Sequence, residues 1–100
     1  MTEPDITTKL VNLLAQAGVA HHQFEQTVLK GVYDRDWPDW YARYLLDHGL
    51  EQLIGQPVAQ AQLGEFLLQS NEARQNQRPE PAWADYTARD IVTRLISSPH

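Results

Sequence analysis

Apolar residues recur at helical intervals over most of the chain, and no stretch alternates apolar and polar residues as a half-buried strand does. From about Asp5 to Leu29 this pattern forms one continuous stripe, which consists of Ile6, Leu10, Leu13, Ala17, Phe24 and Val28. The stripe keeps its phase across Gly18, so we predict a single helix in which this glycine costs about 1 kcal/mol. Two helices that meet at Gly18 are the alternative.

Four further helical segments follow. Asp36 is placed to cap a helix that ends at Gly49, and residues 50–54 form a short turn of helix. Another helix starts at Pro57 and fades into the polar residues 70–79, and the last starts near Pro81. The sequence therefore predicts an all-α fold: a single domain over residues 1–100, built as a compact bundle of four main helices plus a short fifth around an aromatic core.

Composition and charge narrow the classes of partner. The chain carries a formal net charge of −5 and has no basic cluster interleaved with aromatic residues, so we expect no nucleic acid and no anionic membrane surface as partner. No apolar stretch reaches the roughly 20 residues that span a bilayer. Cysteine is absent, which excludes disulfides and thiolate metal sites. Together with an N-terminus unlike a signal peptide, this predicts a cytoplasmic protein.

His21 and Glu25 form the most suggestive polar pair. At about 100° per residue, His21 falls within the apolar stripe of the first helix, and Glu25 lies one turn further on at its edge. An imidazole and a carboxylate one turn apart are suited to bind a divalent ion with ligands from another helix, or to act as a general base and its orienting group. The alternative is a buried, hydrogen-bonded core histidine.

An acidic cluster precedes the second helix. Asp34, Asp36 and Asp39 lie within six residues, and closely spaced carboxylates are ligands for calcium and magnesium. The glycine and the bidentate glutamate of an EF-hand loop are missing, however. Helix capping by Asp36 and Asp39 is the alternative explanation for two of the three carboxylates.

Aromatic residues gather at the starts of the second and the last helix: Trp37, Trp40, Tyr41, Tyr44, Trp83 and Tyr86. Their N–H and O–H groups are suited to fix a ligand in an apolar pocket, and the alternative is that the rings simply fill the core. With the His–Glu pair they define the predicted ligand-binding set, which is His21, Glu25, Trp37, Trp40, Tyr41 and Tyr44. No catalytic residue, metal or cofactor is assigned.

Three functional hypotheses remain, because the chain lacks the motifs of the common hydrolases, kinases, metalloproteases and dehydrogenases. The first is a non-catalytic accessory protein that holds a small ligand or a divalent ion near the predicted set. The second is a protein–protein interaction module that uses an apolar helix face, with a homodimer as one possible form. The third is a small enzyme with His21 as general base and Glu25 as its orienting group.

Three motifs carry a resemblance to other proteins: Ala20-His21-His22-x-Phe24, the run DWPxWYAxYL that starts at Asp36, and Trp83-x-x-Tyr86. In these motifs, over about residues 10 to 92, the chain resembles a group of small all-helical bacterial proteins with no assigned activity. The resemblance implies a shared helical fold and shared use of His21, Trp37, Trp40 and Tyr41. It implies no substrate.

Overall fold

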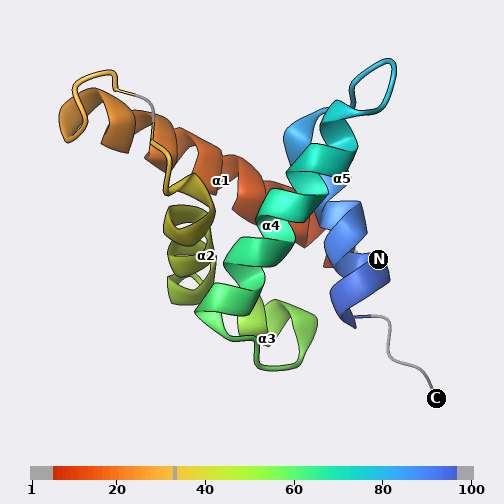
Figure 1. The fold of residues 1–100 in the computed structure, drawn as a ribbon. Helices are drawn as coiled ribbons and strands as arrows, with labels where there is room; N and C mark the ends of the chain where they lie inside the picture. The colour runs from red at the N-terminus through yellow and green to blue at the C-terminus, as the bar shows by residue number, and fades with distance from the viewer. Residues whose placement is uncertain (1–5, 33, 97–100) are drawn as a thin grey trace.

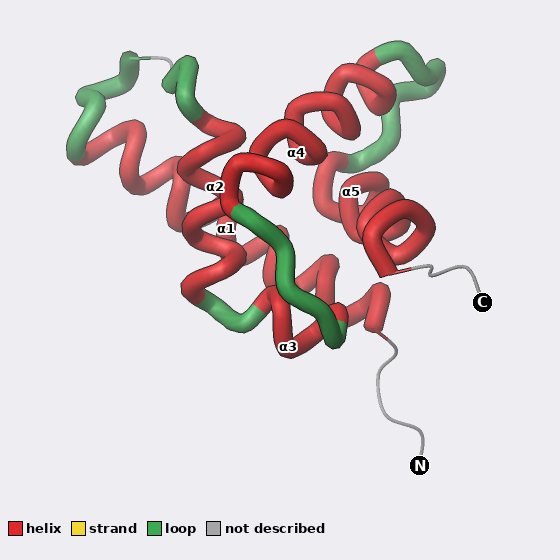
Figure 2. The backbone as a smooth tube through the Cα atoms, turned by 60° about the horizontal axis from the view of Figure 1, so that its bottom comes forward, coloured by secondary structure: helices red, strands yellow, loops and turns green. Residues whose placement is uncertain are grey.

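The fold consists of helices and connecting loops. The structure is a computed structural model that describes residues 6–32 and 34–96, except for the side chain of Ile96. The elements are α1 (Ile6–Thr27), α2 (Trp37–Asp47), α3 (Leu50–Ile54), α4 (Gln60–Gln75) and α5 (Trp83–Ile91), which runs on into the π-helical turn η1 (Val92–Ile96). No strand occurs in these two ranges, as Figure 2 shows, and the predicted all-α class with four main helices and a short fifth is confirmed.

α1 is the helix along which the others are arranged. Figure 1 shows it running across the molecule, with α2 beside its C-terminal half and α5 beside its N-terminal half. α4 packs against both α2 and α5, and α3 contacts α1 and α2. The radius of gyration is 13.8 Å, close to the roughly 13 Å of a compact domain of this length.

The core is aliphatic, so the predicted aromatic core is wrong. Its buried residues are Leu10, Leu13, Leu14, Ala17, Ala42, Leu45, Leu50, Ile54, Leu63, Phe66, Leu67, Ala88 and Ile91. Every tryptophan, and every tyrosine in the described ranges, is only partly buried. Leucine and alanine allow helices to cross closely, whereas indole and phenol rings carry polar groups that need water or a partner, which places these rings at the edge of the core.

α1 continues through Gly18, as the stripe predicts, and buries Leu10, Leu13, Leu14, Ala17 and His21. The stripe fails only at its end. Val28 lies beyond the last helical residue and is 63% exposed, because α1 stops at Thr27 and the chain turns away through Lys30 and Gly31, both with positive φ. The predicted start near Asp5 lies outside the described residues.

The other helix boundaries agree with the predicted ones except at α4. α3 has the predicted bounds, and Gly49 follows α2 in the left-handed region, with a φ of 95°. α4 begins at Gln60 rather than at Pro57. The backbone N–H of Val58 donates to the Glu51 carboxylate at 2.9 Å, and Ala59 is extended, so the residues after Pro57 remain a loop.

The continuity of α1 can be tested by replacing Gly18 with alanine. Among the described residues, no heavy atom beyond its own helix backbone and chain neighbours lies within 4 Å of where the new Cβ would be. We expect Gly18→Ala to raise the free energy of unfolding by about 0.5–1 kcal/mol, because alanine favours the helix and has fewer unfolded conformations to lose. Urea unfolding followed by tryptophan fluorescence measures this change.

Gly49→Ala is the matched control. The positive φ at this position strains any residue with a Cβ. We therefore expect Gly49→Ala to lower the free energy of unfolding by about 1–2 kcal/mol. A break in α1 at Gly18 would make Gly18→Ala destabilising too, and that result would contradict the single helix.

Candidate functional site

A cleft of about 310 Å³ opens beside His21, where α1, α2, α4 and α5 meet. Its volume lies at the lower end of the roughly 300–1,000 Å³ that small-molecule sites occupy. The lining residues combine charged, amide and aromatic side chains: His21, Glu25, Asp34, Trp37, Tyr41, Asn71, Gln75 and Trp83. Polar and aromatic groups from four helices and one loop therefore converge on one small space.

His21 forms the inner wall of the cleft and is only 7% exposed. Its Nε2 lies 2.9 Å from Oδ2 of Asp34, and its Nδ1 lies 3.8 Å from Oε1 of Glu25. An ionised carboxylate only accepts hydrogen bonds. The Nε2 of His21 therefore carries the hydrogen and donates a hydrogen bond to Asp34. The contact with Glu25 is too long for a hydrogen bond and is an electrostatic contact only. The hydrogen-bond partner of His21 is thus Asp34 and not the predicted Glu25.

Asp34 also organises the loop before α2. Its second oxygen, Oδ1, accepts the backbone N–H of Asp36 at 3.0 Å. Asp36 does occupy the N-cap position of α2, but its side chain makes no capping hydrogen bond. The Asp39 carboxylate instead accepts from Gln60 Nε2 at 2.8 Å, which joins the first turn of α2 to the start of α4.

The alternative of a calcium or magnesium site at Asp34, Asp36 and Asp39 therefore has no support from the structure. Asp34 faces His21 and Asp39 faces Gln60, so these carboxylates serve different contacts and do not converge on one point. Within residues 6–32 and 34–96, no group of three or more histidine, aspartate or glutamate side chains is arranged to hold a metal ion. The predicted divalent ion near His21 and Glu25 has no support from this geometry either.

The predicted aromatic residues divide into two groups around His21. Trp37, Tyr41 and Trp83 line the cleft, with ring centroids 5.9 Å apart for Trp37–Tyr41 and 5.0 Å apart for Tyr41–Trp83. Trp40 contacts the His21 ring edge-on at 4.8 Å, and Tyr44 stacks on Trp40 at 5.5 Å, but neither lines the cleft. Of the six predicted ligand-binding residues, four line the cleft, and Trp40 and Tyr44 support its wall.

Asp34, Asn71, Gln75 and Trp83 line the cleft but were not in the predicted ligand-binding set. Of these four, the sequence indicated only Trp83 as a possible pocket residue, among the aromatic residues, and Asp34 only as part of the acidic cluster. Asn71 and Gln75 lie one turn apart on α4, so their spacing places them on one face, but the polar composition of this segment is also typical of a linker. Asp34 belongs to a loop, and no spacing along the chain relates it to His21. Only the tertiary structure brings these two residues together.

Tyr41 reports both the burial and the negative charge of the cleft. Burial raises the pKa of its hydroxyl from the ordinary value of 10.0 to about 12, and the negative charges of Glu25 and Asp34 add to the increase. Both effects disfavour the phenolate, because the anion would lose water and would lie close to two carboxylates. The hydroxyl therefore stays protonated over the physiological range, in a region of negative potential.

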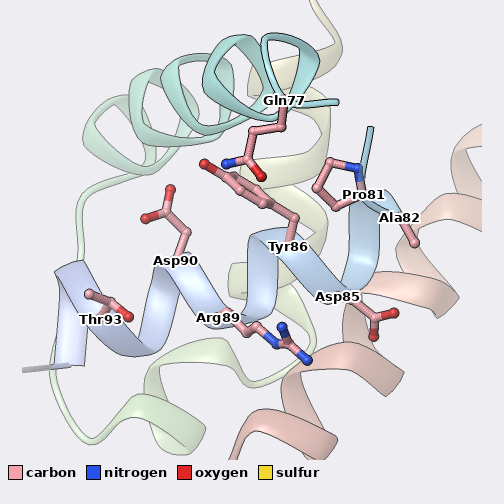
Figure 3. A pocket seen from close by; sticks show the side chains of 8 residues that line it. All are labelled: Gln77, Pro81, Ala82, Asp85, Tyr86, Arg89, Asp90 and Thr93. Atoms are coloured by element: carbon pink, nitrogen blue, oxygen red, sulfur yellow. The ribbon is translucent and has the colours of Figure 1, made fainter. Parts of the chain in front are cut away.

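A second cavity, of about 480 Å³, lies along α5 and includes Tyr86. Figure 3 shows Tyr86 and Asp90 directed toward Gln77 on one side of the helix, whereas Asp85 and Arg89 point to the other side. These polar groups do not converge on a common point, although the cavity is larger than the cleft beside His21. We therefore take the cleft beside His21 as the candidate site.

Comparison of the chain with protein families, with curated proteins and with solved structures gives no match. The resemblance to small bacterial proteins therefore stays a prediction. None of the described helices is long and apolar enough to cross a bilayer.

Removal of the Asp34 carboxylate tests its place in the structure. We expect Asp34→Ala to lower the free energy of unfolding by about 1–3 kcal/mol, because it leaves His21 Nε2 and the N–H of Asp36 without their acceptor. Asp39→Ala is the control, since it removes one exposed hydrogen bond and should cost less than about 1 kcal/mol. Equal losses in urea unfolding would contradict the role given to Asp34.

Titration of Tyr41 tests the potential in the cleft. The difference in tyrosinate absorbance between the wild type and Tyr41→Phe should show one hydroxyl with a pKa of about 12, and with about 10 in denaturant. The folded protein holds this proton more tightly than the unfolded chain does. The contribution of this hydroxyl to the free energy of unfolding is therefore fully present below about pH 10 and is lost between about pH 10 and 12. This decrease is about 1–2 kcal/mol after allowance for solvent screening, and Tyr41→Phe should lack it. A difference titration centred near 10 in the folded protein would contradict the assignment.

Proposed function

We propose that this protein is a non-catalytic small-molecule-binding protein and that its site is the cleft beside His21. The observation that carries the proposal is the convergence of a buried imidazole, two carboxylates, two amide side chains and three aromatic rings on about 310 Å³. Sites for small ligands typically combine such apolar walls with a few fixed polar groups. The absence of cysteine supports a reducing compartment, such as the cytoplasm, as the location of the protein.

The surroundings of His21 favour binding over catalysis. A general base needs a ring nitrogen that reaches the proton of a substrate. Here Nε2 donates to Asp34, and Nδ1 faces the Glu25 carboxylate at 3.8 Å. Because both nitrogens face protein carboxylates and His21 is only 7% exposed, the imidazole is better placed to hold these neighbours than to reach a ligand.

The interaction-module hypothesis has weaker support. In the part of the chain that the structure describes, the large apolar side chains that are exposed are Val19, Val28, Val32 and Leu68. They come from α1, the following loop and α4, and such single exposed side chains are normal on a protein surface. The convergent cleft is the stronger observation, so we place ligand binding before homodimer formation.

Ligand binding is tested by NMR with a fragment set that holds equal shares of amines, neutral heterocycles and carboxylates. The three tryptophan indole N–H signals act as reporters. We expect binding fragments to shift the signals of Trp37 and Trp83, which line the cleft, more than that of Trp40, which does not. Equal shifts of all three signals, or none with any fragment, would contradict the proposal.

A matched pair of variants on α4 serves as control. Gln75→Trp places a large ring at the wall of the cleft and should abolish fragment binding, whereas Gln69→Trp places the same ring on the same helix away from the cleft. Both positions are exposed, so we expect both variants to fold. Fragments that bind Gln75→Trp as tightly as Gln69→Trp would place their site elsewhere.

A further inference from the structure

We propose that the cleft beside His21 takes a small organic cation, either a quaternary ammonium or a protonated amine. The inference rests on the proposed function and specifies the class of ligand. Three features carry it: the charges that line the cleft, the arrangement of its aromatic walls, and the potential at Tyr41.

The charges of the lining are acidic. Glu25 and Asp34 both face the cleft, and no lysine or arginine is among the lining residues. The side chain of Glu25 is 27% exposed, which leaves it accessible from the cleft, whereas that of Asp34 is 11% exposed and bonded to His21. Even a positive charge on His21 would offset only one of these two carboxylates. A ligand therefore meets a net negative wall, of which Glu25 is the accessible part.

Arg35 directly follows Asp34 in sequence, but it is exposed and lines a different cavity. Arg74 directly precedes Gln75 in sequence. Its guanidinium is held by three other groups. It donates to Oδ1 of Asn71 at 3.0 and 3.2 Å, to the Glu80 carboxylate at 2.8 Å and to the carbonyl of Pro81 at 2.9 Å. Glu80 and Pro81 tie Arg74 to the loop before α5, so its charge is matched by Glu80 rather than by the carboxylates of the cleft.

The aromatic walls of the cleft suit a cation. The ring of Tyr41 is nearly perpendicular to that of Trp37, at 80°, and is inclined to that of Trp83 by 45°. All three rings belong to residues that line the cleft, and the electron-rich faces of indole and phenol attract ammonium groups. Trp37 and Trp83 each begin a helix, α2 and α5, so the rings are attached to fixed elements.

The potential at Tyr41 distinguishes the classes of ligand. Glu25 and Asp34 make formation of an anion at this hydroxyl unfavourable, and an anionic ligand in the cleft would meet the same repulsion. A neutral ligand would displace water from around Glu25 without matching its charge. A cation with an apolar surface matches the negative charge of Glu25 and also contacts the aromatic rings, so it avoids both the repulsion and the unmatched charge.

The test compares ligands of one shape that differ in charge. Choline is titrated beside its neutral carbon isostere, in which a tert-butyl group replaces the trimethylammonium group, and beside the carboxylate with the same tert-butyl group. Neopentylammonium and neopentyl alcohol form a second pair, which covers primary amines. We expect at least one cation to bind about tenfold or more tightly than its neutral partner, and the carboxylate to bind least. The indole signals of Trp37 and Trp83 report binding, with Trp40 as internal reference.

Two variants with the same change of charge locate the effect. Glu25→Gln should weaken binding of the preferred cation by about three- to tenfold and leave the neutral isostere unchanged. Glu65→Gln makes the same substitution on α4, at an exposed residue outside the cleft, and should leave both affinities unchanged. Equal effects of the two variants would mean that net charge, and not the cleft, attracts the cation, and would overturn the inference.

The outcomes separate this inference from the proposed function. Neutral or anionic ligands that shift the Trp37 and Trp83 signals and bind as tightly as both cations would overturn the cation class, while the cleft would remain a ligand site. If neither the cations nor any member of the fragment set shifts these signals, the proposed function fails and the cation class fails with it.

Discussion

The hydrogen bond between His21 and Asp34 is the contact on which the arrangement of the cleft depends. It joins the buried face of α1 to the loop that leads into α2, and the other oxygen of Asp34 holds the backbone of Asp36, the N-cap residue of α2. One carboxylate thus sets both the orientation of the imidazole and the start of the next helix. Because Trp37 and Tyr41 lie in the first two turns of α2, their positions beside the cleft follow from this contact.

Aliphatic and aromatic residues occupy different parts of the structure, and this difference explains where the cleft lies. Leucine, isoleucine and alanine fill the crossings of the helices, and Phe66 is the only aromatic residue among the buried members of the core in the described part of the chain. The tryptophans and the described tyrosines lie at the edge, where Trp40 and Tyr41 contact each other and His21. The cleft lies at this edge, with Trp37, Tyr41 and Trp83 in its wall.

Local sequence patterns predicted much of the fold. The features that they did not predict depend on tertiary contacts. The phase of the stripe across Gly18 and the left-handed turn at Gly49 are properties of short segments, and both are present in the structure. His21 was predicted to face inward for the same reason. Its pairing with Asp34 was not predicted, because it depends on how a loop of residues 28–36 returns to α1. The start of α4 was misplaced because Glu51 binds the N–H of Val58, a contact between residues in different elements.

The polar character of the cleft is itself an argument for a binding role. A buried imidazole and its carboxylate partner lose water when the protein folds, and an apolar pair of similar size would often be as stabilising or more so. The same position on α1, one turn beyond Ala17, continues a face that is otherwise aliphatic, so a leucine there would extend the core without this cost. Natural proteins depart from the locally most stable choice mainly at functional sites. In this chain the departure at His21 coincides with a cleft on which two carboxylates, two amide side chains and three aromatic rings also converge, and stability alone does not account for that coincidence.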